Sequence, residues 1–460
     1  MSDEGQRSPA PGQDEALYRP IEQTGPGFYL GVGVLLAIIL FGVYRYLRQF
    51  FLGLGETGMN EPVSWGFYII NFVFFIGISH AGTLISAILR LNQAEWRRPI
   101  TRMAEVITAI VLAIGGLHPI IDLGRPDRIL NIFKWGRLQS PLLWDVMSIT
   151  AYFAASTVYL YLPLIPDIAR LRDRGVRPHW LYDFLSWQWQ GTPRQVHVLS
   201  RAMNLLMILV IPIAVSVHTV ISYIFAMTLE AGWHSTIFGP YFVAGAIFSG
   251  IAALLVVMIV FRKVYHLEGY LKQVHFANLS KLLLAMSAIW FYLTFSEYLT
   301  GFFGQEPTEL SVMMFKFTGP YAIPFWMMIF LNFVVPVSLL SRRKTRTIPV
   351  ILLVSIGIVV GMWIERLIIV VPSLSVPFAD FPRHAYWPSL TEISLLAAAL
   401  AVFCLAFMLF AKFFPLISIW EIEEGREAAV RETSERVASY QPDDAPEDPP
   451  ASGPLPEGAS

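Results

Sequence analysis

Ten apolar runs constrain what this chain can fold into more than any other feature. A helix needs about 20 apolar residues to cross the hydrocarbon core of a bilayer. Because lipid leaves no polar partner for an open backbone, runs of this length predict helices. We therefore expect an all-α polytopic membrane protein with about ten transmembrane helices. The runs occupy residues 28–47, 63–89, 103–123, 141–163, 200–229, 238–261, 278–303, 318–340, 348–371 and 391–414.

The composition agrees with a membrane protein and excludes several cofactors. Of the 460 residues, 55% are hydrophobic and only 15% are charged, whereas a soluble domain carries about 25% charged residues. The 33 Lys and Arg nearly balance the 34 Asp and Glu, which indicates no nucleic-acid partner. The single cysteine, Cys404, and the lack of CxxC and CxxCH motifs predict that this chain binds neither an iron–sulfur cluster nor a covalent c-type haem.

The distribution of Lys and Arg between the runs predicts the orientation. One set of alternating connections carries seventeen Lys and Arg, and the other carries eight. The positive-inside rule then places both termini in the cytoplasm of a multi-pass protein of the bacterial inner membrane. The polar start of the chain predicts no cleaved signal peptide. We expect a disordered N-terminus over 1–27, a ten-span domain over 28–414 and a largely disordered tail over 415–460, because both ends are rich in Pro, Gly, Ser and acidic residues.

The stretch GGLHPIIDLGRPDR, residues 115–128, concentrates ionisable groups at the outer end of the third span. His118 and Asp122 are four residues apart and share a helix face. Gly124 and Pro126 are typical of a helix end, so Arg125 is expected in a turn at the membrane surface. Arg125 and Arg128 also lie on the outer side of the membrane, where the positive-inside rule disfavours basic residues.

The following span begins with SPLLWD, residues 140–145. Pro141 suits the first helical position, with Ser140 as a possible cap. Because consecutive spans are antiparallel, Asp145 is expected at the depth of His118, beside Trp144. The pattern predicts a polar site at the outer surface; the alternative is a set of interfacial residues that cap helix ends and pair with one another.

Other ionisable residues are candidates for a surrounding shell or a proton path. They are expected in the outer third of the membrane, except His80 on the inner side: His218, His234, Glu297, Glu365, Arg366, Glu392 and His80. Each has a structural alternative. Helix packing is the favoured role of His218 and His80, and a buried ion pair is the simplest role of Glu365 with Arg366. The spacing of these groups predicts no metal site, and no span carries the paired His pattern of a haem-binding bundle.

One His, two carboxylates and one Arg suit a reaction that moves protons together with electrons. Oxidation of a quinol releases two protons and two electrons. A neutral His and a carboxylate next to the two hydroxyls can accept the protons, and an Arg can bind a carboxylate or a quinone oxygen. We therefore expect the oxidation of a quinol.

The 115–128 stretch, followed by SPLLWD, resembles the NrfD/PsrC-like membrane subunits of quinone-linked oxidoreductases. Residues 211–250 resemble more particularly the ActC subunit of alternative complex III. The resemblance implies a haem-free subunit with a core of two four-helix bundles, about 63–229 and 238–371. It also implies a site for menaquinol or ubiquinol near the periplasmic face, at His118, Asp122, Arg125 and Asp145. It also implies an iron–sulfur subunit on the periplasmic side, a multihaem c-type cytochrome and a second NrfD-like membrane subunit as partners, and possible proton translocation.

Two other classes of function stay open from the sequence. A secondary transporter would show broken helices and polar residues near the middle of the membrane, whereas the ionisable groups here are expected at one face. A purely structural anchor subunit would keep the fold without needing the His and Asp pair.

Overall fold

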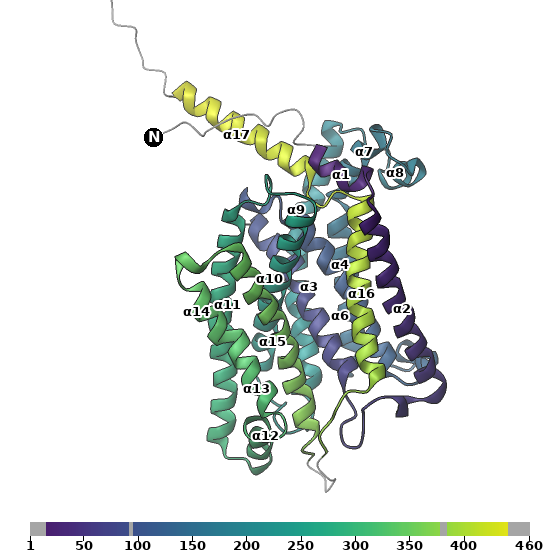
Figure 1. Cartoon of the computed structure of the whole chain (residues 1–460), viewed down its shortest axis with the longest axis vertical. Helices are drawn as coiled ribbons and strands as arrows, with labels where there is room; N and C mark the ends of the chain where they lie inside the picture. Colours follow the sequence, from purple (N-terminus) through teal and green to yellow (C-terminus); the bar gives the residue numbers. More distant parts are fainter. Residues whose placement is uncertain (1–14, 92–94, 378–383, 440–460) are drawn as a thin grey trace, which may run out of the picture. The chain divides into compact units, whose positions relative to one another are not determined.

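The regular structure of this chain is helical throughout the residues that the computed structural model describes, which are 15–91, 95–377 and 384–439 (Figure 1). Within these residues, nine helical segments are long and apolar enough to cross a membrane, and a tenth span results if α6 and α7, which meet at 44°, are counted together. The expectation of an all-α protein with about ten spans is confirmed.

Each predicted run corresponds to one helical segment. Nine are continuous: α2 (Pro26–Leu52), α3 (Phe67–Leu91), α4 (Thr101–Asp122), α6 (Pro141–Tyr161), α9 (Pro193–Ala226), α10 (Phe238–Val264), α11 (Gln273–Gly304), α15 (Ile348–Leu374) and α16 (Leu390–Phe413). The run at 318–340 is α13 (Ala322–Ile329), a π-helical turn η4 (Phe330–Val334) and α14 (Val335–Leu340). Pro336 follows this turn and has no backbone N–H for a regular helical bond.

Short helices connect the spans. They are α1 (Glu15–Glu22), η1 (Leu54–Glu56), η2 (Glu95–Arg97), η3 (Pro126–Arg128), α5 (Asn131–Lys134), α7 (Leu164–Asp173), α8 (His179–Leu185), α12 (Pro307–Phe317) and η5 (Arg343–Thr345). The prediction of disorder is wrong for residues 15–22, because α1 buries Leu17, Tyr18 and Ile21. It is also wrong for α17 (Ile419–Ser439), whose Glu, Arg and Ala residues favour a helix. Residues 1–14 and 440–460 of the two predicted disordered ends lie outside the described residues.

The spans pack as two groups joined by α3 and α10. In the first group α3 packs on α4 and α9, and α6 packs on α4 and α9. In the second, α15 packs on α10 and α13, and α11 packs on α10 and α14. These groups contain the spans of the two predicted four-helix bundles.

The first and last spans, α2 and α16, pair outside these groups, and α16 also packs on α4 (Figure 1). Small residues let the pair approach closely: a Cβ atom added to Gly42 would lie 2.4 Å from the Cβ of Ala398. Ser389 caps α16 by accepting a hydrogen bond from the Glu392 N–H, in a capping box. Two spans distant in sequence thus form one wall beside α4.

Candidate functional site

His118 is buried on α4, with a relative exposure of 2%. Its Nδ1 lies 2.9 Å from the carbonyl oxygen of Ile114, one turn earlier. Because a carbonyl only accepts, Nδ1 carries the hydrogen, and in the neutral ring Nε2 holds a lone pair. Nε2 has no hydrogen-bond partner among the described residues. The imidazole is therefore held as an acceptor with its basic nitrogen unused.

An apolar groove of about 310 Å³ reaches His118. Its walls come from three helices: Ile39, Gly42, Val43 and Tyr46 on α2, Ile114, Leu117, His118, Ile120 and Ile121 on α4, and Leu395, Ala398, Ala399 and Val402 on α16. Val43 and Leu117 are about half exposed at its edge, so the groove opens on a surface that faces lipid. Its size lies at the lower end of ordinary ligand pockets, about 300–1,000 Å³.

Asp122 is one turn beyond His118, as predicted, at the last position of α4. Its Oδ1 is buried and has no hydrogen-bond partner among the described residues. Beside it, Gln49 on α2 donates to the carbonyl of Ile121 (3.1 Å) and accepts from the Tyr68 hydroxyl on α3. Gln49 and Tyr68 were not among the predicted site residues, because a neutral polar residue does not stand out within an apolar run as a charged residue does.

Glu392 has structural partners within the described chain. Its carboxylate accepts hydrogen bonds from the backbone N–H of Gly58 (2.7 Å), the backbone N–H of Ser389 (2.8 Å) and the hydroxyl of Tyr386. The Tyr386 oxygen in turn accepts from the Phe67 N–H (3.0 Å). Burial and the Glu392 charge raise the pKa of Tyr386 well above its usual value. Glu392 thus fastens the segment between α2 and α3 to the start of α16, which favours a structural role over a place in a proton path.

Arg125 does not join His118 in this structure. Gly124 adopts a positive φ of 63° just after α4, which confirms the predicted helix end. Arg125 then points to an exposed pair with Asp127, through two hydrogen bonds of 3.1 Å. This guanidinium lowers the pKa of Asp127. The predicted convergence of Arg125 with the buried groups is therefore wrong, because the turn directs its side chain outward.

Asp145 and Trp144 occupy the first turns of α6, and Pro141 takes the predicted first helical position. Asp145 is 6% exposed, and its Oδ1 has no hydrogen-bond partner among the described residues. Asp145 does not line the groove, and the Trp144 indole donates to the carbonyl of Leu138 instead. The structure leaves Asp145 as a buried carboxylate outside the groove.

His80 on α3 and His218 on α9 are in contact, with ring centroids 3.7 Å apart. His80 Nε2 donates to the carbonyl of Ala214 (2.6 Å), whereas both ring nitrogens of His218 lack partners among the described residues. The prediction that His80 lies on the inner side and His218 in the outer third of the membrane is therefore wrong. Those depths were counted from the ends of the apolar runs, whereas α9 begins several residues before its run.

Glu365 and Arg366 form a buried ion pair on α15, with 3.1 Å between Oε2 and Nη1. Trp290 on α11 donates to Glu365 Oε1 (2.8 Å), and the Arg366 guanidinium stacks over the Phe242 ring at 4.9 Å. The pair joins α10, α11 and α15 within the second group of spans. This arrangement corresponds to the structural alternative of a buried ion pair.

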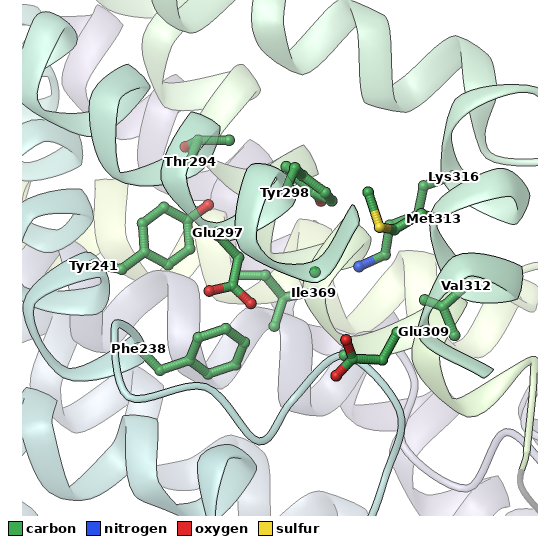
Figure 2. A pocket seen from close by; sticks show the side chains of 12 residues that line it. Phe238, Tyr241, Thr294, Glu297, Tyr298, Glu309, Val312, Met313, Lys316 and Ile369 are labelled. Carbon is green, nitrogen blue, oxygen red and sulfur yellow. The ribbon is translucent and has the colours of Figure 1, made fainter. Parts of the chain in front are cut away.

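Glu297 on α11 lines a second, small cavity of about 50 Å³ (Figure 2). Ser235 donates to its Oε2 (2.5 Å), and the Lys316 amino group and the Glu309 carboxylate also point into the cavity. Lys316, on the neighbouring helix α12, is the basic group whose charge acts on Glu297. Burial lowers the pKa of Lys316 to about 8, although the Glu297 charge opposes that shift. His234 lies at the edge of this region, 3.1 Å from Glu309.

The geometry beside α4 suits a flat, apolar molecule with protons to lose. An imidazole acceptor stands at the wall of a groove that opens toward lipid, and a second unpaired acceptor, Asp122, lies one turn away. Proton transfer to such a group needs direct contact or one intervening water.

Comparison with known proteins supports a redox context. The family model described as polysulphide reductase, NrfD, matches residues 55–377. A protein of Halobacterium salinarum, named as a membrane subunit of a dimethyl sulfoxide reductase, is 34% identical over 233 residues. That alignment spans about half of each chain, 50% of this one and 51% of the relative.

Two further relatives align over most of their length. A subunit of the selenate reductase of Mesobacillus selenatarsenatis is 23% identical, over 77% of this chain and 84% of its own. The integral membrane subunit of the Hdr-like menaquinol oxidoreductase of Archaeoglobus fulgidus is 21% identical, over 88% and 98%.

Proposed function

Because this chain belongs to the NrfD polysulphide reductase family, we propose that it is the quinol-binding membrane subunit of a multi-subunit electron-transfer complex. The proposal rests on His118, which lines an apolar groove open toward lipid and whose Nε2 has no hydrogen-bond partner among the described residues. A quinol has an apolar tail and a ring with two acidic hydroxyls, so it matches both parts of this arrangement.

In the proposed reaction, a quinol enters between α2 and α4, where the groove opens, and places one hydroxyl against His118 Nε2. The imidazole accepts the first proton, and Asp122 accepts the second, directly or through a water. Two electrons leave for an iron–sulfur cluster in a partner subunit, because imidazole and carboxylate groups accept protons but not electrons. Asp145 is a further buried acceptor that can take a proton onward.

The names of the relatives favour this assignment. One is named for menaquinol oxidation, and the other two are named as subunits of reductases, which favours menaquinol and a set of partner subunits. The more specific assignment to ActC of alternative complex III rests on residues 211–250, and it adds a multihaem c-type cytochrome and a second NrfD-like subunit as partners. We place the site near the periplasmic face of a bacterial inner membrane, on the Lys and Arg count.

The test uses the whole complex in native membranes. His118→Ala should reduce quinol oxidation by about 10²–10⁴-fold, the usual contribution of a general base, while the complex still assembles. His197→Ala is the matched control, because His197 is an exposed histidine at the start of α9. Normal turnover by His118→Ala would contradict the site. Mass spectrometry of co-purified subunits tests the partners, and a complex without an iron–sulfur protein would contradict the electron route.

A further inference from the structure

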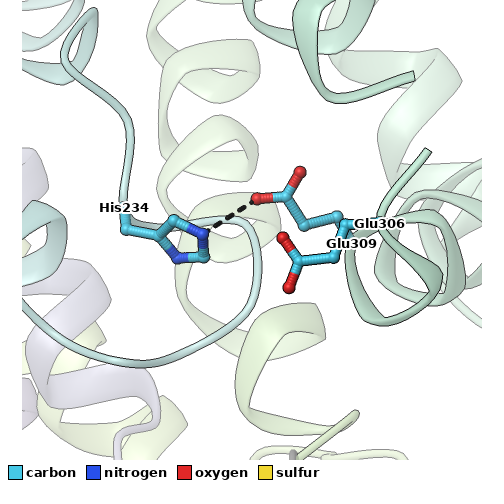
Figure 3. A group of neighbouring side chains, drawn as sticks. All are labelled: His234, Glu306 and Glu309. Atoms are coloured by element: carbon cyan, nitrogen blue, oxygen red, sulfur yellow. Dashed lines mark ion pairs between the residues drawn. The ribbon is translucent and has the colours of Figure 1, made fainter. Parts of the chain in front are cut away.

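Three side chains from two segments meet at one edge of the second cavity (Figure 3). His234 comes from the loop between α9 and α10, and Glu306 and Glu309 come from the start of α12. One ligand atom of each lies within 4.8 Å of the others. This cluster is separate from the groove at His118 and takes no part in the proposed quinol reaction.

The contacts of the two His234 ring nitrogens point to a bound cation. His234 Nδ1 lies 3.3 Å from the carbonyl oxygen of Glu230 and must donate to it. In the neutral ring, Nε2 is then an acceptor. This atom is nevertheless 3.1 Å from Glu309 Oε1, which is also an acceptor (dashed line in Figure 3). Two lone pairs at this distance repel unless a proton or a metal ion lies between them.

A metal ion agrees with the rest of the geometry. Histidines that bind metals usually donate their other N–H to a carbonyl or a carboxylate, which fixes the ring. Two ligands of a tetrahedral zinc ion are about 3.4 Å apart, from bond lengths of about 2.0–2.2 Å. The observed 3.1 Å between His234 Nε2 and Glu309 Oε1 is close to that value, and the ligand atoms of all three residues lie within 4.8 Å of one another.

The carboxylates are available for a cation. Glu306 occupies the N-cap position of α12, but its side chain makes no capping hydrogen bond. Both glutamates lie at the start of α12, so their carboxylates project from the same helix end. The nearby Lys316 charge acts on Glu297. With a neutral imidazole, His234, Glu306 and Glu309 carry two negative charges, which a divalent ion balances.

We propose that His234, Glu306 and Glu309 form a binding site for a divalent transition-metal ion of the zinc class. The imidazole selects such an ion over magnesium or calcium, which prefer oxygen ligands. Three protein ligands leave a fourth position for water. The ion ties the loop before α10 to α12 and closes the side of the cavity where Glu309 stands.

Zinc binding to the intact complex tests the site. After treatment with a chelator, the complex is dialysed against micromolar Zn²⁺ with millimolar Mg²⁺, and bound zinc is measured by mass spectrometry. Wild type should retain one more zinc ion per chain than His234→Ala or Glu306→Gln. His197→Ala, an exposed histidine elsewhere, should match wild type. Bound Co²⁺ should give visible absorption bands of a four-coordinate ion in wild type and in His197→Ala alone.

A proton between His234 and Glu309 in place of a metal ion predicts a different zinc content. If a proton instead bridges His234 and Glu309, wild type and all three variants retain the same amount of zinc, and the proposal fails. Glu306→Gln guards against misfolding, because it alters a residue that neither caps the helix nor pairs with His234. Neither result depends on quinol turnover, so the outcome is independent of the proposed function.

Discussion

His118 donates from Nδ1 to the carbonyl of Ile114, 2.9 Å away on the same helix, and this bond leaves its Nε2 as a free acceptor. The bond is local, so the ring orientation does not depend on a bound molecule. One ring nitrogen, Nδ1, therefore anchors the side chain, and the other, Nε2, is the base.

His118→Asn should separate the two roles of the ring. The Asn amide can still donate to the Ile114 carbonyl, but it supplies no base. We expect quinol oxidation to fall as far as in His118→Ala, by about 10²–10⁴-fold, whereas the thermal unfolding midpoint should stay closer to wild type than that of His118→Ala. Both are measured on the purified complex. If His118→Asn retained most of the turnover, His118 would be a packing residue.

Filling the groove should weaken quinol binding. Ala399→Phe adds a ring to the groove wall, so the KM for a long-tailed quinol should rise more than kcat falls. Leu400→Phe is the matched control, because Leu400 is the next residue, is 46% exposed and does not line the groove. Steady-state kinetics with long-tailed and short-tailed quinols distinguish the two variants. Equal KM values for Ala399→Phe and Leu400→Phe would place the quinol elsewhere.

Tyr386→Phe should destabilise the protein without touching the groove. The substitution leaves the Phe67 N–H and the Glu392 carboxylate each without one buried partner. The expected cost is about 1–3 kcal/mol for each unsatisfied group, visible as a lower unfolding midpoint in detergent. Tyr44→Phe, on an exposed tyrosine of α2, serves as the control and should change little.

Lys316 predicts a specific pH dependence of stability. Its pKa falls from 10.5 to about 8 on folding, so the unfolded chain binds more protons between these values. Stability should therefore rise with pH from about 8 to 10.5, by about 1.4 kcal/mol for each pKa unit. Unfolding midpoints measured over this range for wild type and Lys316→Met isolate the effect. The variant should lack this part of the rise; identical pH profiles would show that Lys316 titrates normally.

Arg125→Gln should leave stability unchanged. The Arg125 and Asp127 side chains are 63% and 52% exposed, and exposed ion pairs contribute little. A thermal scan of the complex checks this expectation. A large drop in the midpoint would mean that Arg125 contacts something buried, such as a partner protein.

The spans were predictable because a long apolar run in a membrane has one physical solution, the helix. The direction of a side chain was not predictable in the same way. Arg125 turns outward because Gly124 reverses the backbone at a positive φ, and His80 meets His218 because α3 and α9 cross at that depth. The importance of α2 and α16 also escaped the sequence, since their contribution to the groove is apolar.

The pairing of α2 with α16 has a consequence for biosynthesis. Spans enter the membrane in order, so the groove beside His118 lacks part of its wall until α16, the last span, has been inserted. Chains that stall before residue 390 should lack a finished quinol pocket. A half-made protein would then be unable to withdraw electrons from the quinol pool before its partners are present to receive them.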